Sequence, residues 1–200
     1  MAEEQPEEVK VEARQFMADV LPTAAESEFQ EGGVGMDMTA WKSLYAAAAN
    51  NNNKNKKDDG DENNNHGNTD LMETFWSQYY DPKSTSLWTM TYDEADSNEN
   101  LPETIDIVTS LVEKTMNQSL DAHCFGVVHV LESLEVEGLW IFNGPDPERL
   151  FGANDDTSWF TWRPIGPDAN DYVRKAVAAV WVPDHGQLHV NIIQHSQAFC

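Results

Sequence analysis

Large hydrophobic side chains follow two different periods along the chain after about residue 36. Several segments repeat them three and four positions apart, as in helices that bury one face. These segments are residues 37–45, 71–80, 105–116 and 172–181. Other short segments alternate or run continuously in β-branched and aromatic residues, which is typical of strands. They are residues 86–92, 125–131, 138–142 and 158–162. Because helices and strands do not alternate regularly, the pattern predicts an α+β fold, a single domain with a largely antiparallel sheet flanked by helices.

Polar residues next to these segments supply capping and turn signals. Asp37 or Thr39 is placed to cap the first helix, and Asn100 with Glu103 resembles the start of another. The helix that Asn100 opens is expected to bury Ile105, Val108, Leu111, Val112, Thr115 and Met116. The five residues Ser133–Glu137 lie between two strands and predict an antiparallel hairpin.

Proline marks the boundaries in the last part of the chain. The run 164–167 predicts a turn after the strand at 158–162, and Pro183 ends the helix before it. Two alternatives are open for residues 188–199, since the alternation at their start favours a strand, whereas a charge-free run is also compatible with a helix.

Two stretches are too poor in apolar side chains to offset the entropy of ordering themselves. Residues 1–35 are expected to form an acidic, disordered and flexible arm, in which Val9–Leu21 becomes helical only on a partner. Residues 50–68, rich in Asn, Lys, Asp and Gly, are expected to form a loop inserted within the domain. The domain itself is therefore placed at residues 36–200.

Charge narrows the classes of partner. The chain has 35 acidic and 12 basic residues, a net charge of -23, which repels nucleic-acid backbones and anionic membranes. A basic protein partner suits this field, although the charge can also serve solubility alone. No apolar run is long enough to span a membrane, no signal peptide is visible, and two cysteines favour a reducing compartment, the cytoplasm.

Histidine and cysteine are the residue types to test for chemistry. His185, His189 and His195 lack the carboxylate spacing of a metal site. His123 and Cys124 are neighbours, whose side chains would point to opposite faces of a strand. No phosphate-binding or dinucleotide-binding glycine motif is present. We therefore expect no catalytic residues, no metal, no cofactor and no small-molecule substrate.

Most of the seven tryptophans lie among apolar neighbours and are expected in the core. Trp159 and Trp162 flank the segment leading to the basic Arg163 and follow a polar loop. Aromatic and arginine side chains anchor many protein interfaces. These three residues are accordingly the candidate partner-binding site.

Several segments form an ordered series with a recognisable identity. They are Trp41–Tyr45, Phe75-Trp76, Ser86–Tyr92, Phe125–Val127, Gly138–Gly144, Trp159–Ile165 and the residues from Tyr172 onward. Taken together, the series resembles the C-terminal domain of the gamma subunit of translation elongation factor 1B, over roughly residues 36–200. The resemblance implies a non-enzymatic scaffold module with a compact α+β fold.

The resemblance is partial. In that family a glutathione-transferase-like domain precedes this one and holds the complex to the nucleotide-exchange subunits, whereas residues 1–35 offer no such domain. Three hypotheses stay open: a protein-interaction subunit in translation elongation, with elongation factor 1 subunits as partners; an accessory structural subunit of another large assembly; and an enzyme with an unrecognised thiol or histidine site.

Overall fold

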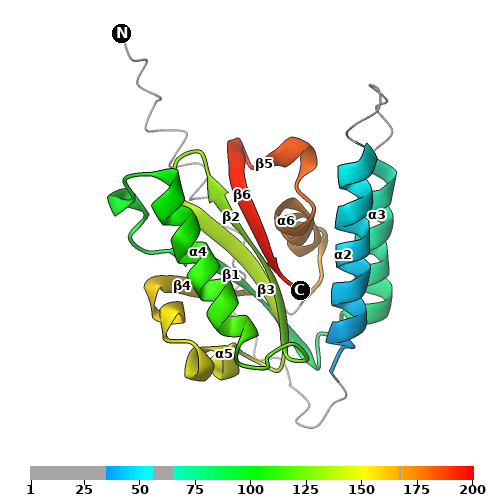
Figure 1. Cartoon of the computed structure of the whole chain (residues 1–200). Coiled ribbons are helices and arrows are strands. Elements are labelled where there is room, and N and C mark those ends of the chain that lie inside the picture. The colour runs from blue at the N-terminus through cyan, green and yellow to red at the C-terminus, as the bar shows by residue number, and fades with distance from the viewer. Residues whose placement is uncertain (1–34, 56–64, 167) are drawn as a thin grey trace.

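A six-stranded antiparallel sheet organises the chain (Figure 1), in the order β4-β1-β3-β2-β6-β5. The computed structural model describes residues 35–55, 65–166 and 168–200. The strands are β1 Thr85–Tyr92, β2 Cys124–Leu131, β3 Val136–Asn143, β4 Phe160–Ile165, β5 Gln187–Leu188 and β6 Asn191–Phe199. The predicted α+β fold with an antiparallel sheet is confirmed.

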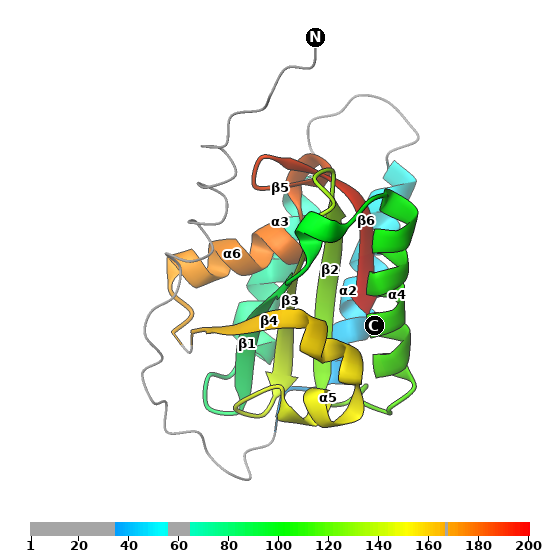
Figure 2. The same ribbon diagram turned by 90° about the vertical axis from the view of Figure 1, so that its left-hand side faces the viewer.

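Helices cover both faces of this sheet, as Figures 1 and 2 show. The helices are α2 Met38–Asn55, α3 Asn65–Thr74, α4 Leu101–Met116, α5 Glu148–Ala153 and α6 Asp171–Trp181. A π-helical turn and three 3-10 turns supplement them: η1 Phe75–Tyr79, η2 Ala95–Ser97, η3 Asp155–Trp159 and η4 Asp184–Gly186. Because α2, α3 and α6 pack on one face and α4 and α5 on the other, β2 is buried along its whole length.

Two hydrophobic cores result, one on each face of the sheet. In the first core, the face under α2, α3 and α6, the Trp41 ring lies 4.9 Å from Phe75 and 5.7 Å from Trp181, measured between ring centroids. The second core, under α4 and α5, is built around Trp140. Gly126 pairs with Trp140 across β2 and β3, and a Cβ on Gly126 would fall 2.1 Å from the indole. The glycine therefore makes room for the largest ring of this core.

Side-chain hydrogen bonds complete the helix ends that the sequence signals indicated. Asp37 accepts a bond from the Ala40 amide at 2.9 Å, and Asn100 accepts one from Glu103 at 3.0 Å. At the end of α6, the His129 Nε2–H donates to the Val180 carbonyl at 2.6 Å. These contacts satisfy backbone groups that a helix leaves unpaired at its ends.

Four details of the sequence analysis are wrong. Ser158 and Trp159 belong to η3, not to a strand, because the Asn154 side chain caps that turn by accepting from the Asp156 amide. Pro164 and Ile165 extend β4 instead of forming a turn, since an edge strand tolerates a residue without an amide N–H. The side chain of Met116, at the last position of α4, is 41% exposed.

The asparagine-rich tract at 50–68 is not a loop along its whole length, contrary to the prediction. Its ends are helical, because α2 runs to Asn55 and α3 begins at Asn65. The remaining part of the tract, residues 56–64, and the predicted arm with its Val9–Leu21 segment lie outside the described residues. Residues 188–199, left open between strand and helix, contribute to β5 and form β6. The limits of the domain, 36–200, stay a prediction.

Candidate partner-binding surface

The segment between α5 and β4 carries the candidate tryptophans. Trp159 ends η3 with 48% of its side chain exposed, whereas Trp162 is half-buried against the second core. Alternate residues of β4 face opposite sides of the sheet, so Trp162 and Phe160 contact the second core and Ile165 contacts the first. Arg163 therefore points away from Trp162, into a separate polar hollow of about 360 Å³. The structure brings the two tryptophans to one side of the molecule and places Arg163 on the other.

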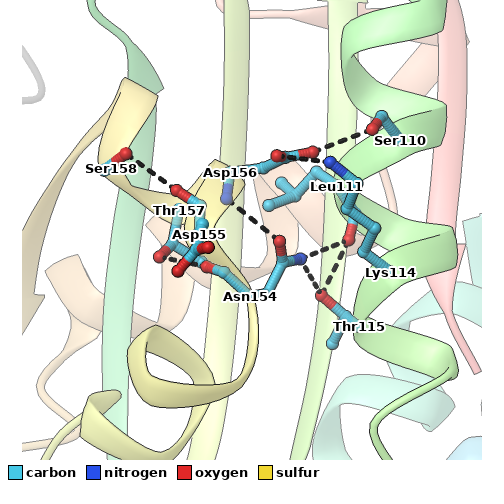
Figure 3. A network of polar contacts seen from close by, with 9 residues as sticks. All are labelled: Ser110, Leu111, Lys114, Thr115, Asn154, Asp155, Asp156, Thr157 and Ser158. Atoms are coloured by element: carbon cyan, nitrogen blue, oxygen red, sulfur yellow. Dashed lines mark hydrogen bonds and ion pairs between the residues drawn. The ribbon is translucent and has the colours of Figure 1, made fainter.

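A buried polar network beneath this segment fixes its position (Figure 3). Asn154, only 2% exposed, lies at its centre. Its Nδ2 donates to the Leu111 carbonyl and to Thr115 Oγ1, each at 2.9 Å, and its Oδ1 accepts from the Asp156 amide at 3.1 Å. Asn154 thus joins α4 to the start of η3 with its side-chain amide satisfied on both ends.

Asp156 is the second anchor of the network. Its carboxylate is buried and accepts from the Ser110 hydroxyl at 2.8 Å and from Lys114 Nζ at 2.6 Å. A buried carboxylate is tolerated when such partners replace water. Since Ser110 and Lys114 project from adjacent turns of α4, Asp156 holds η3 against the helix.

The network determines how the aromatic rings are presented. Lys114 Nζ, bound to Asp156, also lies 6.0 Å from the centroid of the Trp159 ring. The Trp162 Nε1–H donates to the Thr157 carbonyl at 3.1 Å, and the Trp162 ring lies 5.5 Å from Phe151. The exposed aromatic side chains thus stand on a segment held by hydrogen bonds.

A shallow hollow of about 530 Å³ lies beside these rings. It is lined by Phe151, Asp155, Thr157, Ser158, Phe160 and Trp162. Phe151 is 37% exposed, and its ring forms part of the wall. The surface therefore offers a concave aromatic site with a carboxylate at its rim.

The histidine and cysteine candidates do not assemble into a catalytic pair. Burial raises the pKa of the Cys124 thiol to about 12, and the thiol donates to the Leu120 carbonyl. His123 Nδ1 instead accepts from the Arg149 guanidinium at 2.9 Å. His189 lies 3.6 Å from Glu137, and the side chain of His185 lies outside the described part of the chain. Among the described residues, no group of three or more histidine, cysteine or acidic side chains is arranged to hold a metal.

Sequence reasoning missed the residues that build this surface from below. Asn154 to Ser158 form a polar run, which is typical of a solvated loop. The only local signal is an Asn or Asp that can bond to its own backbone two residues on, as Asn154 does with the Asp156 amide. Their partners on α4 are about forty residues away in sequence, so burial was not visible in the pattern.

The comparison with protein families decides the assignment of the fold. A model described as elongation factor 1 gamma, conserved domain, matches residues 25–146. The chain belongs to the elongation factor 1 gamma family. The match spans more than half of the chain and confirms the resemblance found in the sequence. A search of curated proteins found no match.

The matched range ends before the candidate surface. It contains α2 and α3 as well as β1, β2, β3 and α4, and it ends at residue 146, before α5 begins at Glu148. Phe151, Trp159 and Trp162 consequently lie outside the matched residues. No helix among the described residues is long and apolar enough to cross a membrane.

Proposed function

We propose that this elongation factor 1 gamma domain is a non-catalytic protein-interaction subunit acting in translation elongation, in the cytoplasm. Its partners are other proteins, with elongation factor 1 subunits as the first candidates, and Trp159 and Trp162 are the anchors of its binding surface. The family match supports the role in translation. Arg163 is not part of this surface, because it faces the opposite side of the sheet.

The observation that carries the interaction role is the exposure of Trp159 on a fixed segment. A large ring that is 48% exposed leaves apolar area in water. The hydrogen bonds of Asn154 and Asp156 fix the backbone segment that carries this ring, and Lys114 Nζ, bound to Asp156, lies 6.0 Å from the ring centroid. A preorganised aromatic side chain loses little conformational entropy on binding, which is why such residues dominate interfaces.

The buried thiol argues against the alternative of a cysteine enzyme. A nucleophilic cysteine needs a thiolate, and the raised pKa of Cys124 keeps its sulfur protonated at neutral pH. The remaining alternative is an accessory structural subunit of an assembly unrelated to translation. Partner identity separates the two.

Affinity purification of the tagged full chain tests the proposal. Elongation factor 1A or the exchange subunits are expected to co-purify with the native chain. The amount recovered is expected to fall with the Trp159→Ala variant. Tyr172→Ala is the matched control, since Tyr172 is a ring 42% exposed on α6. Recovery that is unchanged by Trp159→Ala, in a variant with native thermal stability, overturns the assigned surface. Stable recovery with an unrelated complex overturns the role in translation.

A further inference from the structure

We infer that the hollow beside Phe151 and Trp162 is a receptor for an arginine side chain of the partner protein. The inference rests on the proposed function, since it names the chemical group that the partner inserts. It concerns the residues that line the hollow of about 530 Å³, which include Trp162 but not Trp159.

Every side-chain donor that lines the hollow is already used inside the protein. The Thr157 hydroxyl donates to the Asn154 carbonyl at 2.7 Å, and the Ser158 hydroxyl donates to the Asp155 carbonyl at 2.7 Å. The Trp162 Nε1–H donates to the Thr157 carbonyl at 3.1 Å. What the lining side chains still offer is oxygen lone pairs, the Asp155 carboxylate and the faces of rings. Such a site complements a ligand that only donates.

The charge around the hollow is negative and also favours a cationic ligand. No basic side chain is among its lining residues, and the Asp155 side chain is exposed at its rim. The cation of α4, Lys114, is bound to Asp156 and lies against Trp159. With a net charge of -23, the whole chain attracts a positively charged group.

Aromatic walls make the site suitable for a cation in particular. A cation over a ring face is stabilised by the ring's electron density, more so when partly shielded from water. The protein already uses this contact elsewhere, with Arg174 5.2 Å from the Trp76 centroid and Lys42 3.8 Å from the Phe199 centroid. Phe151, exposed at the hollow, presents the same chemistry to a partner.

Arginine fits this receptor better than lysine. A guanidinium group is planar, so it can lie on a ring face while its in-plane N–H groups reach oxygen acceptors such as Asp155 and Ser158. An ammonium group is a more strongly hydrated point charge and satisfies both demands less well. The expected order of affinity is therefore arginine, then lysine, then the uncharged isostere citrulline.

A titration of the full chain with acetyl-Gly-Arg-Gly-amide tests the inference. The Trp162 indole N–H resonance is expected to shift saturably, with a dissociation constant in the millimolar range. Asp155→Asn and Phe151→Ala are each expected to weaken binding by about threefold to tenfold, the factor typical of one ion or cation–ring contact. Asp70→Asn, an exposed carboxylate on α3 across the sheet, is the matched control and is expected to change nothing.

The outcomes separate this inference from the proposed function. The arginine receptor is overturned if the citrulline peptide binds equally well or if the lysine peptide binds more tightly. It is also overturned if the Trp162 resonance is unchanged at the solubility limit of the arginine peptide. If that happens while Trp159→Ala still depletes the partner, the proposed function stands without it. If the peptide binds as expected but Trp159→Ala does not change recovery of the partner, the arginine receptor stands and the assignment of Trp159 as an anchor does not.

Discussion

The two sides of the sheet hold their helices in different ways. On the α2, α3 and α6 side, aromatic rings fill the first core, where Trp41 and Trp181 contact each other and each contacts both Phe75 and Phe125. On the α4 and α5 side, part of the contact is the polar network of Asn154 and Asp156. The first arrangement leaves its rings inside, whereas the second keeps Trp159 and Phe151 at the surface.

This difference separates stability from recognition. Burial of apolar area stabilises a fold without direction, and it removes the rings from any partner. Hydrogen bonds have direction, so the network can fix η3 while the aromatic side chains above it remain accessible. Variants on the two sides should therefore differ in which property they lose.

Trp41→Ala should produce the largest effect. The Trp41 side chain is 0% exposed and touches rings of η1, β2 and α6. Its removal leaves a cavity, and the free energy of unfolding should fall by about 3–5 kcal/mol. Urea denaturation measures the loss, with the exposed Trp159→Ala expected within about 0.5 kcal/mol of the native chain. Similar losses of stability in the two variants would contradict the separation of stability, supplied by the first core, from recognition by exposed rings.

Asn154→Ala should disrupt the polar network that joins α4 to η3. The variant leaves the Asp156 amide without its acceptor and removes two donors to α4, so we expect a loss of about 2 kcal/mol. Because the Thr157 carbonyl would shift, the Trp162 indole resonance should move as well. Asn117→Ala, at the exposed end of α4, is the matched control. A stability loss with an unmoved indole resonance would show that the network does not position the rings.

The sequence predicted α4 well because its signals are local. The cap at Asn100 and the spacing of Val108, Leu111 and Val112 repeat within a few residues, and the structure buries all three side chains. Met116 continues the same period but is exposed, since it lies at the last position of the helix. Periodicity predicts which face of a helix is buried, but not how far along the helix that face is covered.

The candidate site was only partly predictable. The aromatic character of Trp159 and Trp162 led to the prediction of a binding site in this segment, but the 3-10 turn depends on Asn154 contacts with a distant helix. The separation of Arg163 from Trp162 follows from strand alternation, once Pro164 is accepted within an edge strand. Phe151 and Asp155 carried no sequence signal for a receptor, because a hollow is formed by tertiary packing.

His129, which bonds to the end of α6, should make the stability of the folded chain depend on pH. Burial lowers the pKa of His129 from its ordinary value of 6.5, with His195 acting in the same direction, while the Val180 carbonyl and Glu137 oppose the shift. The unfolded chain therefore binds a proton that the folded chain binds less readily. Stability is complete above about pH 6.5 and should fall as the pH drops below it, by up to about 1.4 kcal/mol per pH unit.

Denaturation across this pH range, repeated on His129→Gln, checks the assignment. Glutamine has a donor for the Val180 carbonyl but does not titrate, so the fall in stability should shrink. His123→Gln is the comparison variant, because burial and then Arg149 also lower the pKa of His123, but this half-exposed side chain should contribute less than the buried His129. The other ionisable groups around this site are Glu137 and His195, which lie near His129, and His189, which lies 3.6 Å from Glu137. A slope identical in the native chain and in His129→Gln would assign the pH dependence to those residues instead.

Lys42→Met should have the smallest effect and the opposite sign. Lys42 extends from α2 to the second core, where its Nζ lies 3.8 Å from the Phe199 ring centroid and 3.6 Å from Asp121. The residue is only 6% exposed, and burial lowers its pKa. Methionine retains much of the apolar stem and removes the cost of burying the charge, so stability should rise by about 1 kcal/mol. Asp121→Asn is the companion variant, expected to be near neutral because the Asp121 side chain is 68% exposed. A loss of stability in Lys42→Met would show that the contacts of the ammonium group with Phe199 and Asp121 outweigh the cost of its desolvation. Charge as well as ring packing would then join α2 to the sheet.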